Sequence, residues 1–190
     1  MSLPRTILTG LLLVGFWLSL TLGSLAPPSY GANGSQKGEY RLKAAFLYNL
    51  AKFTEWPPAA FSDHQASHIV CIVGEDPFGL EIDQLTTKPV HDRPLTIKRL
   101  QADDQLLGCH LLYVSRTAID HTTSILRMLQ KTPVLTICDN DGCAEAGFMI
   151  NMRMVENRVT LDLNLDAVQQ TPLKLSSQLI RLTRIVKGQP

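Results

Sequence analysis

The sequence has little net charge and no repeats. Its 190 residues include 18 basic and 17 acidic side chains, which gives a formal charge of +1 at pH 7. A protein that binds nucleic acid or acidic membranes usually needs a clear positive excess, so this balance argues against both kinds of partner. The absence of Gly-X-Y, heptad and longer internal repeats excludes collagen-like, coiled-coil and solenoid architectures.

Motifs that would indicate catalysis or nucleotide binding are also missing. The sequence has no Gly-x-Ser-x-Gly elbow to hold an activated serine. Gly74 and Gly79 flank a loop that contains Glu75 and Asp76, whose negative charges oppose a bound phosphate. We interpret this loop as a turn in which Asp76 caps the start of a helix.

Three acidic residues close together in the sequence are candidates for a metal or acid–base site. Asp139, Asp141 and Glu145 follow a predicted strand, but Asp-Asn-Asp-Gly is first of all a turn sequence and lacks the other ligands of a calcium loop. His64 and His68 are four residues apart, but His68 begins a predicted strand, so the pair would not share a helical face. We therefore expect a protein that is not an enzyme, with no catalytic residues, metal or cofactor.

Cysteine is scarce, and no two cysteines form a Cys-x-x-Cys pair. Because the histidines also lack finger-like spacing from the thiols, a zinc site is disfavoured. An even number of cysteines in an oxidising compartment favours disulfides, here two bonds with three alternative pairings, and free buried thiols are the remaining alternative. The four residues are Cys71, Cys109, Cys138 and Cys143.

The N-terminal segment has the composition of an export signal. Arg5 precedes an uncharged apolar run at residues 7–22, and small residues around Gly31 follow. This order predicts a cleaved secretory signal peptide and a periplasmic location. An uncleaved anchor is the alternative, because the run is nearly long enough to span a bilayer. The predicted divisions are a signal peptide at 1–31, a linker at 32–37 and one domain at 38–187.

Apolar runs rich in β-branched residues alternate with helical patterns in the middle of the chain. Strands are predicted at 68–74, 93–100, 109–115 and 133–138. Helices are predicted at 39–56, where Pro57 and Pro58 stop the helix, and at 78–85 and 118–131. Such alternation indicates a parallel sheet covered on both faces.

The pattern changes towards the C-terminus. Residues 148–155 and 158–165 alternate with period two around Glu156-Asn157, which predicts an antiparallel hairpin. Apolar residues then recur at helical spacing, which predicts a C-terminal helix. These residues are Leu175, Leu179, Leu182, Ile185 and Val186. The predicted fold class is α/β: a three-layer sandwich with a mostly parallel sheet, a C-terminal antiparallel hairpin and helices on both faces.

Six blocks occur in order along nearly the whole predicted domain. They are KAAFLYNLAKFTEWP at 43–57, CIVGEDPFG at 71–79, DRPLTIKRL at 92–100, CHLLYVS at 109–115, PVLTICD at 133–139, and RVTLDLNL at 158–165 followed by LSSQLIRL at 175–182. Together these blocks resemble the YfiR family of periplasmic regulators.

The resemblance implies an exported, non-catalytic repressor. Such proteins contact the periplasmic region of an inner-membrane diguanylate cyclase and lower cyclic-di-GMP signalling and biofilm formation. The resemblance also implies an α/β sandwich that is often a homodimer, and sequestration by an outer-membrane OmpA-like lipoprotein. The alternative function is a periplasmic small-molecule-binding sensory module, with its ligand in the crevice at 74–79.

The resemblance also bears on the cysteines. Cys71 and Cys109 fall on the paired cysteine positions of the family, which implies a bond between them. Aligning the ends of the two predicted strands offsets these cysteines by three residues, about 10 Å at strand rise, so a bond requires a change of register. Cys138 and Cys143 depart from the family pattern and form a second candidate pair.

A repressor that acts by contact needs aromatic or aliphatic anchors on its surface. Arg158 is a further candidate because it begins the strand of the RVTLDLNL block. For the apolar candidates, packing in the core is the alternative, since amphipathic helices bury such residues by default. The candidate partner-binding residues are Tyr48, Phe53, Trp56, Arg158, Leu179 and Leu182, with Ile185 beside them.

Overall fold

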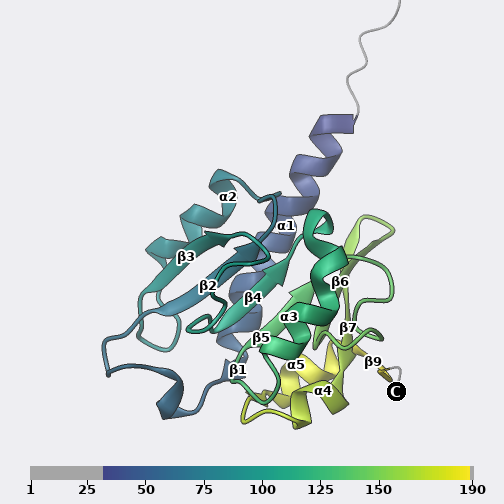
Figure 1. Cartoon of the computed structure of the whole chain (residues 1–190). Helices are drawn as coiled ribbons and strands as arrows, with labels where there is room; N and C mark the ends of the chain where they lie inside the picture. Colours follow the sequence, from purple (N-terminus) through teal and green to yellow (C-terminus); the bar gives the residue numbers. More distant parts are fainter. Residues whose placement is uncertain (1–31, 189–190) are drawn as a thin grey trace, which may run out of the picture. The chain divides into compact units, whose positions relative to one another are not determined.

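The computed structural model describes residues 32–188, and the predicted signal peptide at 1–31 lies outside the described residues. Seven strands form one mixed sheet in the order β3-β2-β4-β5-β6-β7-β9 (Figure 1). They are β2 (His68–Val73), β3 (Leu95–Leu100), β4 (Leu111–Val114), β5 (Leu135–Cys138), β6 (Ile150–Val155), β7 (Arg158–Asn164) and β9 (Arg184–Val186). A separate antiparallel pair joins β1 (Thr54–Glu55) to β8 (Lys174–Leu175).

Helices connect these strands. The α-helices are α1 (Ala32–Lys52), α2 (Leu80–Asp83), α3 (Thr122–Met128), α4 (Leu165–Gln169) and α5 (Ser177–Arg181), and the 3-10 helices are η1 (Pro58–Ala60), η2 (Gln84–Thr87) and η3 (Arg116–His121). Residues 32–37, which were predicted to be a linker, form the first turns of α1. None of the helices between residues 32 and 188 combines the length and the apolar character needed to cross a membrane.

Within the seven-stranded sheet the strands pair in parallel, except for the antiparallel hairpin β6–β7. The first four strands of this sheet take the order second, first, third, fourth along the chain, so the strand that carries Cys71 lies beside the strand that follows Cys109. The hairpin turns at Glu156 and Asn157, which both have positive φ, and asparagine tolerates this conformation well. The predicted α/β fold with a mixed sheet is confirmed.

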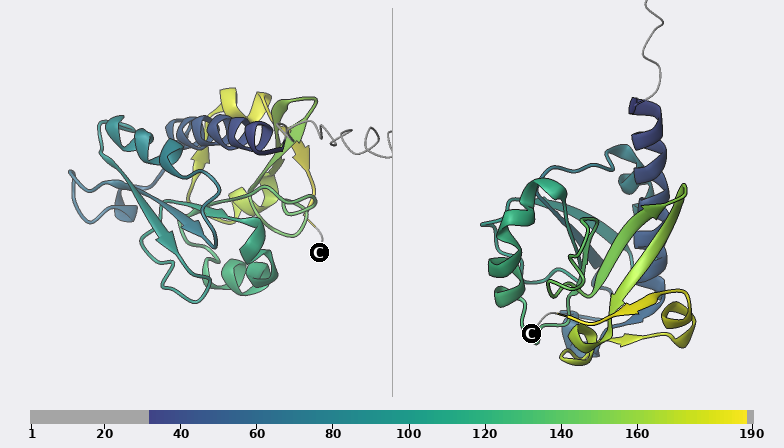
Figure 2. Two further views of the ribbon diagram at one scale, coloured as in Figure 1. Left: turned by 90° about the horizontal axis from the view of Figure 1, so that it is seen from above. Right: turned by 90° about the vertical axis from the view of Figure 1, so that its right-hand side faces the viewer.

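Alternate residues of the central strands face two separate cores, because successive side chains of a strand point to opposite faces. On one face, Val70 and Ile72 of β2 pack in the same core as Leu47 of α1. On the other face, Cys71 and Val73 pack in the core that contains Ile125 of α3. Figure 2 shows α1 and α3 on opposite sides of the sheet. These are the three layers that the sequence predicted.

Helix α1 ends earlier than predicted. It stops at Lys52, whereas the sequence predicted a helix up to Trp56 ended by the two prolines. The Thr54 hydroxyl donates a hydrogen bond to the carbonyl oxygen of Leu50, and Thr54 and Glu55 pair with β8. The prolines therefore follow a short strand instead of ending the helix.

The predicted C-terminal helix is wrong in its extent. Ser176 caps α5 by accepting a hydrogen bond from the Leu179 amide, but this helix ends at Arg181. The chain then forms β9, in which Ile185 is the parallel partner of Leu163 in β7. The helical spacing of the apolar residues is local, whereas the open edge of β7 offers backbone hydrogen bonds that β-branched residues fit well. Tertiary pairing therefore replaces the end of the helix.

Candidate functional site

The loop at 74–79 uses its polar groups internally. The Asp76 carboxylate accepts hydrogen bonds from the amides of Phe78, at 2.7 Å, and Gly79, at 3.3 Å, and from Nε of Arg99, at 2.8 Å. The residue that precedes α2 is Gly79, so Asp76 closes the turn and is not the helix cap that the sequence predicted. This carboxylate is committed to the fold at the crevice where the sensory-module hypothesis placed a ligand.

The three acidic residues after β5 do not form one cluster. Asp139 is buried, whereas Asp141 is exposed. No group of three or more histidine, cysteine, aspartate or glutamate side chains within residues 32–188 is arranged to hold a metal ion. Asp139 instead belongs to an ionic cluster with α1.

This ionic cluster joins α1 to the carboxyl ends of β4 and β5. Nζ of Lys43 lies 2.7 Å from Oδ2 of Asp139 and 2.5 Å from Oε1 of Glu39, and the lysine and aspartate side chains are both fully buried. Arg116, at the start of η3, approaches Asp139 to 3.6 Å and Glu39 to 3.7 Å. The Tyr40 hydroxyl donates to the same oxygen of Asp139 at 3.1 Å.

Two tyrosines of the cluster are held in the neutral form. Burial, together with the negative charge of Asp139, raises the pKa of Tyr40 to about 12. Burial raises the pKa of Tyr113 as well, with Asp139 again adding to the effect. A phenol with a raised pKa is a weaker acid, so both side chains stay protonated at neutral pH. The Tyr40 hydroxyl donates to Asp139, whereas the buried Tyr113 hydroxyl has no hydrogen-bond partner among residues 32–188. The cluster therefore positions α1 on the sheet.

The structure contains two disulfides. Cys71 is bonded to Cys109, with 5.9 Å between their Cα atoms, and Cys138 is bonded to Cys143, with 6.5 Å between Cα atoms. Cys71 is the register partner of Leu112, so the three-residue offset is real. No shift of register is needed, because Cys109 precedes β4 and lies in a turn where its amide bonds to the Leu106 carbonyl.

The candidate partner residues of α1 and β1 differ in exposure. Tyr48 and Phe53 are half-buried, and the Tyr48 hydroxyl donates to the carbonyl oxygen of Pro89 at 3.0 Å. Trp56 is buried, and its indole N–H donates to the carbonyl oxygen of His110 at 3.1 Å. The structure thus places Trp56 in the core and leaves parts of the other two rings at the surface.

The candidate partner residues near the C-terminus also differ in exposure. Leu179 is 3% exposed and packs in the same core as α1, whereas Leu182 is 69% exposed. Ile185 of β9 is also exposed. Because the Ser176 amide bonds to the Phe53 carbonyl, the start of this segment is held next to the end of α1.

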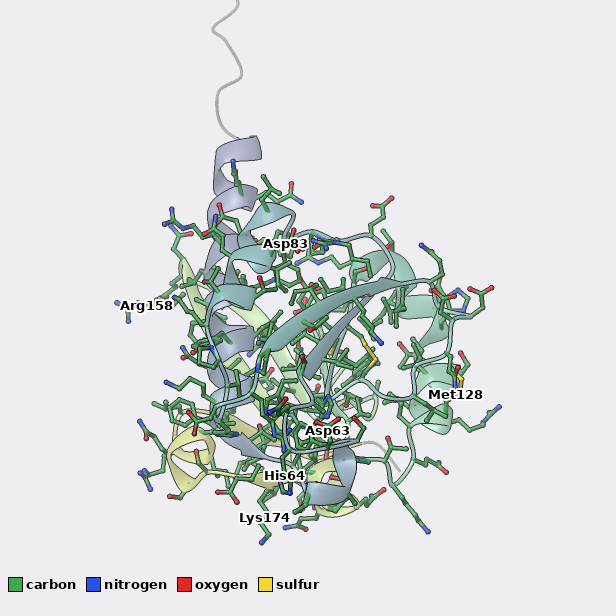
Figure 3. The ribbon with its side chains drawn as sticks, turned by 90° about the vertical axis from the view of Figure 1, so that its left-hand side faces the viewer. Asp63, His64, Asp83, Met128, Arg158 and Lys174 are labelled. Carbon is green, nitrogen blue, oxygen red and sulfur yellow. A yellow bond between two sulfur atoms is a disulfide. The ribbon has the colours of Figure 1, made fainter. Side chains whose placement is uncertain are left out.

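Arg158 lies apart from these residues. It is exposed at the start of β7, whereas β9 pairs with Asp162–Asn164 at the other end of that strand. Four to six residues of strand correspond to roughly 13–20 Å. Figure 3 shows Arg158 projecting from a different part of the surface than His64 and Lys174. One compact contact patch does not contain all the candidates.

Buried charges carry structural roles that the sequence did not predict. Lys43 stands on a helix in an amphipathic pattern, where a lysine is ordinarily solvated. Asp162 is buried between Nε of Arg153 and Nε of Arg184, each at 2.7 Å. Although burial acts to raise it, these hydrogen bonds keep the pKa of Asp162 below its usual value. Local spacing gives no signal for such pairs, because the partners lie on different elements.

Comparison with known proteins gives one finding. A family model described as YfiR/HmsC-like matches residues 40–184. No curated protein matches the sequence significantly. The matched region begins within α1 and ends at the first residue of β9, so it covers the other six strands of the sheet, both disulfides and the ionic cluster except Glu39. The chain therefore belongs to the YfiR/HmsC-like family.

Proposed function

We propose that this protein represses an inner-membrane diguanylate cyclase by binding its periplasmic region, which lowers cyclic-di-GMP signalling and biofilm formation. The single observation that carries the proposal is the family match over residues 40–184, since the family is one of periplasmic regulators of diguanylate cyclases. The two disulfides fit an oxidising compartment. A signal peptide at 1–31 would direct the domain to that compartment and then be removed.

A regulator without chemistry of its own must act by differential binding. It shifts an equilibrium only to the extent that it binds one state of its partner more tightly than the other. Here the favoured state is the inactive conformation of the cyclase's periplasmic region. Repression is then lost when a competitor holds the regulator, and an OmpA-like outer-membrane lipoprotein is the proposed competitor.

The proposed contact surface lies around the C-terminal strand. Leu182 and Ile185 are large apolar side chains that are mostly exposed, and Phe53 contributes a partly exposed ring at the adjoining end of α1. Tyr48 contacts Lys88 and Pro89 before β3, the other edge strand of the sheet, and lies outside this surface. Exposed apolar side chains of this size are the usual anchors of protein contacts. Trp56 and Leu179 are buried and are therefore not proposed as contacts. Arg158 belongs to a second contact, for which homodimer formation is one use.

The test compares binding and signalling by two variants. Leu182→Asp places a charge at the proposed contact, and Leu80→Asp places the same charge at another exposed leucine on α2, which Figure 1 shows far from α5. The purified proteins are tested for capture of the cyclase's periplasmic domain, and cyclic-di-GMP is measured in cells that carry each variant.

We expect Leu182→Asp to lose capture and to raise cyclic-di-GMP, while Leu80→Asp behaves like the wild type. A wild-type protein that neither captures the periplasmic domain nor changes cyclic-di-GMP would refute the proposal. Equal loss in both variants would refute the assignment of the surface.

A further inference from the structure

A cavity of about 350 Å³ lies beside the end of α1, at the edge of the sheet where β2 and β3 begin. This edge is opposite to the loop at 74–79, where the sequence placed a ligand crevice. Three chain segments supply the lining: β1 with η1, the start of β2 with the loop before it, and the loop before β3. The lining residues are Glu55, Trp56, Pro58, Phe61, His64, His68, His91 and Arg93.

His68 is the unusual member of this lining. Its side chain belongs to a residue that is 2% exposed, and neither ring nitrogen has a hydrogen-bond partner among residues 32–188. The neighbouring His110 differs, because one ring nitrogen bonds to the Ile69 amide at 3.0 Å and the other to the Ala60 carbonyl at 3.1 Å. Buried polar groups are nearly always paired in folded proteins. His110 is therefore a structural histidine, whereas His68, which lines the cavity, keeps a buried donor and a buried acceptor that no group among residues 32–188 uses.

The walls around His68 are aromatic. The ring centroid of His68 lies 5.0 Å from that of Trp56 and 4.9 Å from that of Phe61, both in edge-on arrangements. Pro58 adds a further apolar surface. Such walls bind the apolar body of a small molecule, and the cavity has the volume of ordinary ligand sites, which begin at roughly 300 Å³.

The charges around the cavity favour an anion. Arg93 lies over Phe61, with 3.9 Å between Cζ and the ring centroid, and its Nη1 donates to the carbonyl oxygens of Asp63 and Ala66, both at 2.9 Å. No hydrogen bond within the described part of the chain uses its Nε or Nη2. These N–H groups remain available to a ligand, and a guanidinium prefers carboxylates.

The other charged and titratable groups around His68 are also compatible with an anionic ligand. Burial lowers the pKa of His68 to about 3, with smaller contributions in the same direction from His110, His91 and Arg93. His64 also lines the cavity, and Glu55 is the one acidic residue in the lining, where it is exposed to solvent. A single acidic side chain at the rim is compatible with a monoanion and unfavourable for a phosphate dianion.

We propose that this cavity binds a small monocarboxylic acid with an apolar body. The carboxylate accepts hydrogen bonds from the neutral His68 ring and from Arg93, and the apolar body packs against Trp56 and Phe61. The proposal does not depend on binding to a cyclase. It gives the sensory-module hypothesis a site that lies at the opposite edge of the sheet from the one the sequence indicated.

The experiment uses benzoate as the probe and benzamide as its neutral isostere. Binding to the purified domain is measured by isothermal titration calorimetry, and the ring signals of the histidines are followed by NMR. We expect saturable binding of benzoate, at least tenfold weaker binding of benzamide, and shifts of the His68 signals without shifts of His121, which is exposed and lies outside the lining.

The matched variants are His68→Phe and His121→Phe, each checked for folding by thermal unfolding. His68→Phe keeps the ring but removes the nitrogens, so benzoate binding should weaken at least tenfold, whereas His121→Phe should bind normally. Failure of benzoate to bind, equal binding of benzamide, or shifts that avoid His68 would each overturn the proposal. The NMR measurement on the wild type decides the matter even if His68→Phe does not fold.

Discussion

Lys43 and Asp139 form a fully buried ion pair, with 2.7 Å between Nζ and Oδ2, although 96 residues separate them in the sequence. The pair fixes α1 against the end of β5, directly beside the Cys138–Cys143 disulfide. Removing one member of a buried pair leaves the other charge without compensation in a medium of low polarity.

Lys43→Met should destabilise the protein by about 3–5 kcal/mol, because the buried Asp139 carboxylate loses its main partner. The double variant Lys43→Met with Asp139→Leu should recover a large part of this loss. Arg41→Met is the control, since Arg41 is exposed and lies 3.8 Å from Glu81, a surface pair worth about 0–1 kcal/mol. Urea unfolding at pH 7 measures all three. Equal effects of the two single variants would contradict the assignment.

The two disulfides should contribute unequally to stability. The Cys71–Cys109 bond spans 38 residues and the Cys138–Cys143 bond spans 5. In the chain-entropy model these loops correspond to about 4 and about 2 kcal/mol. Replacing each pair with serine and comparing the free energies of unfolding tests the order. A larger loss from the shorter loop would show that local packing outweighs loop entropy here.

Gly74→Ala should be far more destabilising than Gly79→Ala. Both glycines have positive φ, but a Cβ at Gly74 would collide with Ser115 and would lie 2.8 Å from Thr117 Oγ1 and 2.9 Å from Ala118 Cβ. At Gly79 no atom lies within 4 Å of the added carbon. The second change should cost about 1–3 kcal/mol for the backbone alone, and the first clearly more. Thermal unfolding of the two variants gives the comparison, and similar melting temperatures would contradict it.

The stability of the protein should fall as the pH falls below 6.5. His68 has a folded-state pKa of about 3 and an unfolded value of 6.5, so between these values only the unfolded chain takes up the proton. The free energy of unfolding then decreases by about 1.4 kcal/mol for each pH unit, from this histidine alone. The pKa of His110 is lowered as well, chiefly by burial, which steepens the dependence.

His68→Phe removes the side chain whose proton uptake in the unfolded chain contributes to this pH dependence. Unfolding measured between pH 4 and 7 should therefore show a shallower dependence in this variant than in the wild type. Parallel curves for the two proteins would contradict a buried neutral His68.

Leu179 and Leu182 should respond differently to truncation, although both were candidates for partner contact. Leu179→Ala should cost about 2–5 kcal/mol, because it leaves a cavity in the core shared with α1. Leu182→Ala should change the free energy of unfolding by less than about 0.5 kcal/mol, because its side chain is exposed. Urea unfolding distinguishes them. A stable Leu179→Ala variant would mean that this residue is free for a partner.

The strands of the sheet could be predicted from the sequence because their signal is local. A run such as residues 68–73 is apolar at nearly every position, as a strand buried on both faces requires. The exceptions come from elements whose neighbours decide their form. Ile185 fits a helical spacing with Leu182, but it forms a strand because β7 has an open edge beside it.

The candidate site could be predicted only in part. The sequence identified which residues are apolar enough to anchor a partner, but not which of them face solvent. Trp56 and Leu182 are both apolar residues that the sequence predicted as partner anchors, yet the first is buried and the second is 69% exposed. Exposure depends on which other segments cover a residue, and in this chain β8 and α5 return to the end of α1 after more than a hundred residues.

The sequence by itself determined the family, the number of cysteines, the α/β fold class and the hairpin, since each depends on residue types at short or fixed spacing. The tertiary structure alone decided that Lys43 is paired in the interior, that β9 completes the sheet, and that His68 faces a cavity without a partner. These features join residues from different elements. Their energies come from burial and pairing across the fold, which no local pattern records.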